Sequence, residues 1–378
     1  MAERTDEVAL LTYSTKPRGG VVHTLALAEA LADLGVAVTV WSLGRGGDTG
    51  FFRAVDARVA TRVLPLPEID GESVGERVLR SIAVLADGLR ADPPRGVVHA
   101  QDCISANAAG RALGGCIRTV HHLDRFTTPE LARCHERAIV EPYAHVCVSA
   151  AVAQELRLGW GIHARVIPNG VDAARFAAAD PRAVARWRSR LGEYLLAVGG
   201  IEPRKGSLEL LDAYARLRTT RPDLALVIGG GETVFDYRDY RAEFDTRAAR
   251  LGVAPVVLGP VPDPDMPALV AGASAFAFPS VKEGFGLAAM EALAAGVPVV
   301  MSDLPVLREV FGGAVDFAAD PAALAAALDT ALASALDTAL GTALSRPDPA
   351  RAARGRALAR RYTWSAAAAA HVAFYERS

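Results

Sequence analysis

Short runs rich in Val, Ile and Leu alternate with stretches of helical spacing along almost the whole chain. The first half contains six such runs: Val8–Tyr13, Val36–Leu43, Val97–His99, Arg118–His121, His145–Ser149 and Arg165–Ile167. Between the first two, the apolar residues of Val22–Leu34 recur at helical spacing. Strands that alternate with helices form parallel sheets covered on both faces, so this pattern predicts a doubly wound α/β fold.

The strand–helix alternation restarts after a charged, strand-free stretch at Asp172–Leu191. The second set of expected strands is Tyr194–Val198, Ala225–Ile228, Val256–Leu258, Ala275–Phe278 and Val297–Met301, with a helix over Ser207–Arg218. A chain of 378 residues is long enough for two domains. We therefore expect two Rossmann-like domains, residues 1–172 and 190–361.

Two helices are expected after the second set of strands. Pro321–Leu344 is rich in Ala and Leu and contains the near-duplicates ALDTALAS and ALDTALGT, which indicates an Ala-rich helix at the surface. The last segment, Tyr362–Tyr375, reads as an amphipathic helix that must bury its aromatic residues.

Composition and charge exclude several classes of protein. The 41 Lys and Arg against 43 Asp and Glu give a net charge of −2, so no basic field is present to hold a nucleic acid. The N-terminus lacks the apolar core of a signal peptide, and no stretch reaches the roughly 20 apolar residues that span a bilayer. We expect a cytoplasmic protein with no integral membrane segment. The four cysteines form no Cys-x-x-Cys pair, which predicts buried small side chains rather than a metal site.

Two acids, Glu283 and Glu291, lie eight positions apart in KEGFGLAAMEAL, directly after the expected strand Ala275–Phe278. Ligands of open α/β sheets bind where such strands end. A helix that begins near Gly286 would leave the backbone N–H groups of Phe285, Gly286 and Leu287 free to bind an anion or sugar hydroxyls. The alternative is that Glu283 caps the loop and Glu291 is an exposed helix acid.

Two adjacent cations, Arg204 and Lys205, follow the expected strand Tyr194–Val198 and precede a helix. Cations beside a helix N-terminus suit a diphosphate, by charge and by the helix dipole. An exposed basic turn is the alternative interpretation. A competing phosphate motif, Gly44, Gly46 and Gly50 in GRGGDTG, has the wrong spacing and the wrong strand for a dinucleotide fingerprint.

The segment SVKEGFGLAAMEALAAGVPVVMSDLPVLREV resembles the E-x7-E signature of the retaining GT-B glycosyltransferases of family 4, and the likeness extends over nearly the whole chain. The resemblance implies two Rossmann-like domains that face each other across a cleft. It also implies a C-terminal helix, within residues 362–378, that crosses back to the first domain. Members of this family transfer a sugar from a nucleoside-diphosphate donor.

The resemblance also assigns roles to residues of the first half. Gly19 and Gly20 resemble the family's Gly-Gly loop on the donor diphosphate, and His121 in TVHH matches its active-site histidine. His122, Asp124 and Arg125 are expected on the acceptor side. Where family members carry a diphosphate-binding Arg, this chain has Gly200, so we expect Arg204 to supply that charge while Lys205 keeps the family's Lys position.

Together these residues predict transfer of a hexosyl group, without a metal or other cofactor, to the hydroxyl of an unidentified acceptor, and the resemblance implies that the configuration is retained. Glu283 and His121 are the expected catalytic residues. Gly19, Gly20, Arg204, Lys205, Phe285, Gly286, Leu287 and Glu291 are expected to bind the donor, with Glu291 on the ribose. The candidate acceptors are a small molecule, a glycan and a lipid that the protein reaches by peripheral membrane contact. A sugar-nucleotide epimerase and a non-catalytic nucleotide-sugar-binding partner are the alternatives.

Overall fold

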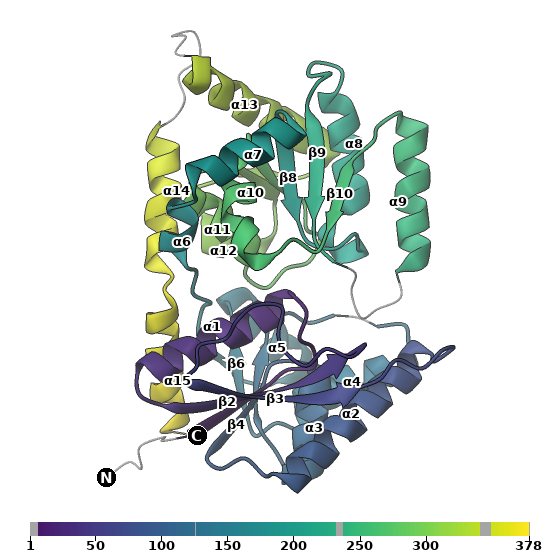
Figure 1. Cartoon of the computed structure of the whole chain (residues 1–378), viewed down its shortest axis with the longest axis vertical. Coiled ribbons are helices and arrows are strands. Elements are labelled where there is room, and N and C mark those ends of the chain that lie inside the picture. Colours follow the sequence, from purple (N-terminus) through teal and green to yellow (C-terminus); the bar gives the residue numbers. More distant parts are fainter. Residues whose placement is uncertain (1–6, 125, 232–236, 341–348, 378) are drawn as a thin grey trace. The chain divides into compact units, whose positions relative to one another are not determined.

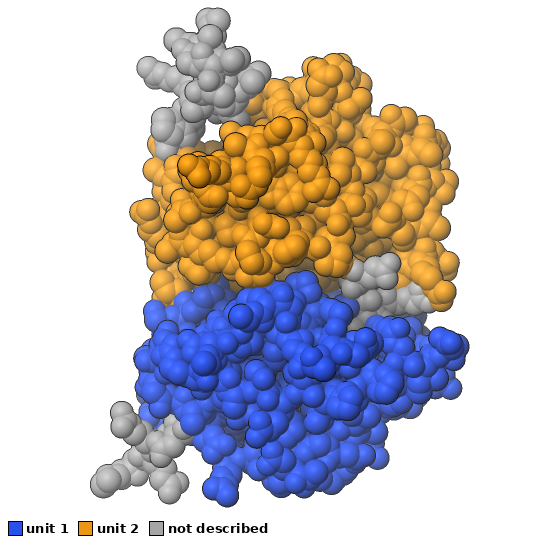
Figure 2. Space-filling model, viewed as in Figure 1, with its two compact units in different colours: residues 1–170, 364–378 blue, residues 171–363 orange. Residues whose placement is uncertain are grey.

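The computed structural model describes residues 7–124, 126–231, 237–340 and 349–377. The chain divides into two compact units, shown in two colours in Figure 2. Unit 1 comprises Met1–Gly170 and Trp364–Ser378, and unit 2 comprises Val171–Thr363. Each unit holds one parallel sheet with helices on both faces, which confirms the expected α/β fold class (Figure 1).

The sheet of unit 1 has seven parallel strands in the order β3-β2-β1-β4-β5-β6-β7. They are β1 (Glu7–Leu11), β2 (Ala37–Arg45), β3 (Val59–Leu66), β4 (Val97–Ala100), β5 (Ile117–Val120), β6 (Ala144–Cys147) and β7 (Arg165–Val166). Its helices are α1 (Gly19–Asp33), α2 (Val74–Ala91), α3 (Cys103–Leu113), α4 (Pro129–Val140), α5 (Ala150–Trp160) and α15 (Trp364–Tyr375).

The sheet of unit 2 has six parallel strands in the order β10-β9-β8-β11-β12-β13. They are β8 (Tyr194–Val198), β9 (Ala225–Gly229), β10 (Val256–Gly259), β11 (Ala275–Phe278), β12 (Val299–Ser302) and β13 (Asp316–Ala318). Its helices are α6 (Ala173–Ala177), α7 (Pro181–Leu191), α8 (Ser207–Leu217), α9 (Arg238–Leu251), α10 (Met266–Gly272), α11 (Leu287–Ala295), α12 (Pro305–Phe311), α13 (Pro321–Leu340) and α14 (Pro349–Arg361), with short 3₁₀ turns at Pro203–Lys205 and Asp263–Asp265.

Strands β1, β8 and β11 are mainly apolar because helices cover both faces of each sheet. Val8, Leu10 and Leu11 of β1 have no exposed surface, and neither have Leu195 of β8 and Phe276 of β11. Two strands were not expected from the sequence. Strand β3 is an edge strand with mostly exposed residues and a proline, and β13 has only three residues, so neither carries the apolar run that marks the buried strands.

Helix α13 differs from the expected surface helix. Leu324, Leu328 and Leu332 are fully buried and belong to the apolar cluster that also contains residues of α8 and β8. Because these leucines recur every four residues, one stripe of the helix faces the core. The last part of the expected helix, residues 341–344, lies outside the described residues. Within the described part of the chain, no helix is both long and apolar enough to cross a membrane.

The C-terminal helix α15 belongs to unit 1, where it packs against α1. Ala367, Ala368 and Tyr375 are buried among the apolar residues of α1 and β1. The Tyr375 hydroxyl is 2.7 Å from Nδ1 of His99 on β4, and the other ring nitrogen of His99 is 2.7 Å from the Thr119 hydroxyl. The imidazole of His99 therefore links the last helix of the chain to the middle of the sheet.

Replacement of Tyr375 with Phe tests this link. The change removes only the hydroxyl and leaves Nδ1 of the buried His99 without its partner, so unfolding should become easier by about 1–3 kcal/mol. Urea denaturation measures the loss. Tyr143→Phe is the matched control. Tyr143 is 58% exposed, so loss of its hydroxyl should change the free energy of unfolding little. Equal effects of the two substitutions would show that the His99 contact does not hold α15.

Candidate functional site

The site of unit 2 lies where the strand order reverses. Strands β8 and β11 are neighbours in the sheet, but the chain continues from β8 toward β9 and from β11 toward β12, on opposite sides of this pair. The loops after the two strands diverge at such a switch point, which leaves a crevice at the carboxyl edge of the sheet. A hydrogen bond of 2.9 Å from the Val281 N–H to the Arg204 carbonyl joins the two loops.

The expected acid and the two expected cations meet at this point. Nζ of Lys205 is 2.8 Å from Oε2 of Glu283, and a guanidinium nitrogen of Arg204 is 3.5 Å from the same oxygen. Arg204 also contacts Oε1 of Glu202 at 3.0 Å. The side chains of Lys205 and Glu283 are only 18% and 11% exposed, so their interaction is weakly screened by solvent. The structure thus brings Glu283, Arg204 and Lys205 into one cluster, which excludes the exposed basic turn.

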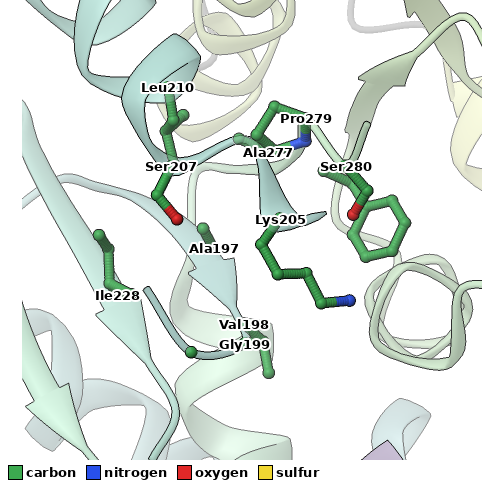
Figure 3. Close-up of a pocket in the computed structure, with 12 residues that line it drawn as sticks. Ala197, Val198, Gly199, Lys205, Ser207, Leu210, Ile228, Ala277, Pro279 and Ser280 are labelled. Atoms are coloured by element: carbon green, nitrogen blue, oxygen red, sulfur yellow. The ribbon is translucent and has the colours of Figure 1, made fainter. Parts of the chain in front are cut away.

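A pocket borders this cluster (Figure 3). Its lining combines the ends of β8 and β11 with the start of α8: Ala197, Val198, Gly199, Gly200, Lys205, Ser207, Leu210, Ile228, Ala277, Phe278, Pro279 and Ser280. The Lys205 side chain extends past Gly199, and its Nζ is 5.2 Å from the centre of the Phe278 ring. The pocket therefore offers bare backbone and one cation, which suits a ligand with a compact negative charge.

Two glycines make this arrangement possible. Gly206 has φ +63°, and a Cβ there would overlap the Pro279 carbonyl oxygen. Gly199 has φ +144°, and a Cβ there would lie 3.3 Å from Cε of Lys205. Glycine at both positions allows the turn after β8 to pass close to the loop after β11.

Gly200 lines the same pocket, at the position where the family Arg is expected. As a glycine, it offers a ligand no side chain. Arg204 is nearby in the cluster, but its guanidinium lies between the carboxylates of Glu202 and Glu283. Its replacement of the missing Arg remains a prediction.

Glu291 lies in the middle of α11, which packs against α6. Removal from water raises the pKa of the Glu291 carboxyl to about 8. The charge of Arg175 opposes this rise, and the carboxylates of Asp263 and Asp172 add to it. Glu291 is therefore largely protonated at neutral pH and can both donate and accept hydrogen bonds, unlike an exposed helix acid.

The turn between the two acids has the expected free backbone N–H groups, but one of its side chains is buried. Within the described residues, no hydrogen bond uses the backbone N–H of Phe285, Gly286 or Leu287 as donor, as at an uncapped helix start. The Phe285 side chain is 2% exposed and its ring lies 5.2 Å from that of Tyr362. Phe285 therefore anchors the turn in the core, and only its backbone is available to a ligand.

Unit 1 has its own switch point, between β1 and β4. Gly19 and Gly20 form the first turn of α1 after β1, rather than a separate loop, and no side chain caps this helix. His121 follows β5, and a Cβ on Gly20 would lie 3.9 Å from its ring. The structure thus places Gly20, one of the two expected glycines, beside the expected histidine.

The His121 ring is neutral at ordinary pH. Burial holds its pKa well below the usual range, and the charges of His23 and Arg118 act in the same direction. Its Nε2 is buried and has no hydrogen-bond partner among the described residues. The ring suits hydrogen bonding to a hydroxyl better than proton transfer near neutral pH. Next to it, Nε2 of His122 is 2.8 Å from Asp124, and Arg125 lies outside the described residues.

Three residues near these sites were missed by sequence reasoning. Arg175 and Asp263 form an ion pair of 2.8 Å beside Glu291, and nothing in their sequence spacing links them. Gln101, at the end of β4, is 2% exposed, and neither atom of its amide has a partner within the described residues. A buried amide of this kind favours a bound hydroxyl or water. The motif HAQD around it was the available signal.

Asp263 also belongs to an Asp-x-Asp triplet, Asp263-Pro264-Asp265, a pattern that can hold a metal. In the structure, the Asp263 carboxylate is engaged by Arg175. No group of three or more His, Cys, Asp or Glu side chains in the described ranges is arranged to hold a metal ion. Metal independence of the reaction remains a prediction.

Two family models match the chain, one in each half. Residues 17–175 match the model described as Glycosyltransferase Family 4, and residues 187–345 match Glycosyl transferases group 1. The two models together cover the switch points of both units.

Individual relatives agree with these models. The chain is 29% identical to a phosphatidyl-myo-inositol mannosyltransferase of Mycobacterium leprae, over 96% of this chain and 94% of that protein. It is 43% identical to O-antigen chain mannosyltransferase B of Escherichia coli, but the match covers only 34% and 33% of the two chains.

Solved structures share the fold. Sucrose-phosphate synthase of Thermosynechococcus elongatus superimposes with a TM-score of 0.75 at 20% identity, over 98% of each chain. HepE of Anabaena, in complex with UDP and glucose, superimposes with a TM-score of 0.72 at 19% identity, over 98% of this chain and 100% of that one.

Gly206→Ala should destabilise unit 2 more than Gly252→Ala does. Both glycines have positive φ, +63° and +67°, so both changes carry a left-handed cost of about 1–2 kcal/mol. Only the Ala at 206 meets another atom, the Pro279 carbonyl oxygen, which should add about 1–3 kcal/mol. Urea denaturation compares the two. Equal losses would mean that the loops after β8 and β11 are not held in close contact.

Glu291→Gln should make stability less dependent on pH. The folded pKa of Glu291, about 8, lies above its unfolded value, so the folded state binds a proton more tightly and the wild type loses stability as pH rises between the two values. Between about pH 5 and about pH 8, the free energy of unfolding of the variant should rise relative to that of the wild type. The relative gain should be at least about 1.4 kcal/mol, which corresponds to a pKa shift of one unit. Denaturation curves at both pH values measure this. A constant difference would contradict the raised pKa.

Proposed function

This chain belongs to the GT-B glycosyltransferases of family 4, and we propose that it transfers a hexosyl group from a nucleoside-diphosphate sugar to an acceptor hydroxyl. The observation that carries the proposal is the cluster of Lys205, Arg204 and Glu283 at the switch point of unit 2, beside a pocket lined by glycine backbone. The remaining steps follow from the charge and hydrogen-bonding capacity of these residues.

The leaving group of such a reaction is a nucleoside diphosphate, whose negative charge grows as the bond to the sugar breaks. Lys205 and Arg204 are fixed next to the pocket by their contacts with Glu283, so they need little rearrangement to stabilise that charge. The unbonded N–H groups at the start of α11 add positive potential. These groups stabilise the leaving diphosphate without a metal.

Glu291 would bind the ribose of the donor. A protonated carboxyl can donate to one ribose hydroxyl and accept from the other, whereas a carboxylate could only accept. Its raised pKa therefore suits a diol and adds no negative charge near the diphosphate.

Glu283 would orient the donor sugar rather than attack it. Its Oε2 is engaged by Lys205 and Arg204, and its Oε1 accepts a hydrogen bond of 3.2 Å from the Gly284 N–H. A carboxylate with both oxygens engaged is a poor nucleophile. We therefore favour retention through attack on the same face as the departing phosphate, without a glycosyl-enzyme intermediate. The neutral His121 would hold a hydroxyl of the sugar or the acceptor.

The names of the relatives indicate which sugar donors to test first. The Mycobacterium leprae protein is named a mannosyltransferase that acts on phosphatidyl-myo-inositol, and the Anabaena structure contains UDP and glucose. GDP-mannose and UDP-glucose are accordingly the first donors to test, with inositol-containing lipids among the acceptors. A non-catalytic nucleotide-sugar-binding protein is the second candidate, since Gly200 stands in place of the family Arg.

The deciding experiment supplies each donor with a panel of acceptors and follows release of the nucleoside diphosphate and formation of product. Lys205→Gln should lower kcat/KM about a hundredfold to a thousandfold, the effect of removing one group that stabilises transition-state charge. Arg216→Gln, an exposed position further along α8, is the control and should retain activity. Turnover should persist in EDTA, and NMR of the product should show the anomeric configuration of the donor.

Binding of a nucleotide sugar without turnover of any acceptor would favour the non-catalytic candidate. Full activity of Lys205→Gln would refute the assignment of the diphosphate site. Loss of activity in EDTA that Mg²⁺ restores would refute metal independence, and an inverted product would refute retention.

A further inference from the structure

Tyr240 reaches the start of α8 from the neighbouring helix α9. The two helices pack together, and the Tyr240 hydroxyl accepts a hydrogen bond of 3.3 Å from the backbone N–H of Leu208, the second residue of α8. The residue before it, Ser207, lines the pocket together with Lys205 (Figure 3). The Tyr240 hydroxyl therefore lies one residue away from the lining of the pocket proposed for the donor diphosphate.

Two further contacts between α9 and α8 fix the position of Tyr240. Phe244, one turn later, is 1% exposed and belongs to the apolar cluster that includes Leu210 of α8. Nε of Arg247 is 2.9 Å from Oδ1 of Asp212, which also lies on α8. Tyr240, Phe244 and Arg247 are spaced by four and three residues, so they share one side of α9. The packing of this side on α8 holds the tyrosine in place.

The start of α8 favours the oxygen atoms of an anion. Gly206 precedes the helix and has no side chain to cap it, so the first N–H groups of α8 lack partners within the helix. Such N–H groups and the helix dipole attract negative charge. The Tyr240 oxygen accepts from one of these groups, at Leu208, and so brings an O–H group to the same place.

This O–H group can donate a hydrogen bond of its own. Among the residues that the structure describes, no hydrogen bond uses it as the donor. Burial raises the pKa of the Tyr240 hydroxyl, the carboxylates of Glu209 and Glu243 act in the same direction, and the hydrogen bond from Leu208 opposes them. The hydroxyl is therefore protonated at neutral pH, and the N–H bond that it accepts strengthens it as a donor. Both carboxylates are exposed, so solvent screens their repulsion of a phosphate.

The pocket has few donors of its own. Gly200 lines it where the resembling family has Arg, and the guanidinium of Arg204 lies between Glu202 and Glu283. Among the lining residues, Lys205 alone has a charged side chain. A diphosphate has more oxygens than one ammonium group can bond, so a further donor beside the pocket would add to its affinity.

We propose that the Tyr240 hydroxyl donates a hydrogen bond to a phosphate oxygen of the nucleoside-diphosphate donor while it continues to accept from Leu208. The inference rests on the proposed function and adds to it a binding residue from α9, outside the E-x7-E segment. The alternative is that the hydroxyl only caps α8 and must leave when a phosphate oxygen takes its place. Loss of the hydroxyl weakens diphosphate binding in the first case and strengthens it in the second.

The test is calorimetric titration of the purified full-length protein with UDP, GDP, ADP and TDP. Tyr240→Phe should raise the Kd of the nucleoside diphosphate that binds the wild type by about tenfold to a hundredfold, the effect of one hydrogen bond to a charged group. Tyr214→Phe is the matched control, because the Tyr214 hydroxyl, further along α8, donates to the Leu224 carbonyl at 2.7 Å. This control should be easier to unfold in urea but should keep the Kd of the wild type.

Lys205→Gln separates failure of this inference from failure of the proposed function. If Lys205→Gln weakens binding and Tyr240→Phe does not, the diphosphate site stands and the assignment of Tyr240 is wrong. Tighter binding by Tyr240→Phe, or equal weakening by Tyr214→Phe, would overturn the assignment as well. A wild-type protein that binds none of the four nucleotides would refute the proposed function and this inference together.

Discussion

The reversal of strand order between β8 and β11 is the constraint on which the site of unit 2 depends. All strands of the sheet run parallel, so the loops after these two neighbours begin at the same edge and then diverge. The first loop carries Lys205 and Arg204 and the second carries Glu283. Charges placed this close and partly removed from water must be paired, and the ion pairs among these three residues satisfy that requirement. Gly206 permits the close approach by leaving room for the Pro279 carbonyl.

The sequence predicted the strands that carry the site because these strands are apolar and largely buried. Strands β8 and β11 were expected at their observed bounds, since continuous apolar runs mark strands covered on both faces. Strand β3 gave no such signal because it is an edge strand whose residues, apart from the first and the last, are exposed or half-buried. Lys205, Glu283 and His121 could be placed at strand ends because each comes at or shortly after the end of an apolar run. A family resemblance supported this placement.

What the sequence could not reveal is the partner of each charge. The pairing of Lys205 with Glu283 joins residues 78 positions apart and depends on strand order, which no local pattern specifies. The same holds for Arg175 and Asp263, which set the surroundings of Glu291 from two other elements. Burial of Phe285 was missed for a related reason: a turn residue between two glycines gives no sign of which side faces the core.

The two acids of the E-x7-E motif show how the same residue type can serve two purposes at positions only eight residues apart. Glu283 lies on the loop, where two cations hold its oxygens in place. Glu291 lies on the helix that follows, where loss of water raises its pKa to about 8 and the proton stays on the carboxyl. One acid is thus held by positive charge while the other is kept neutral by its surroundings, and environments that separate two carboxyls in this way mark a division of roles. A diphosphate next to the first and a ribose diol next to the second is the arrangement of ligand groups that this difference in charge favours.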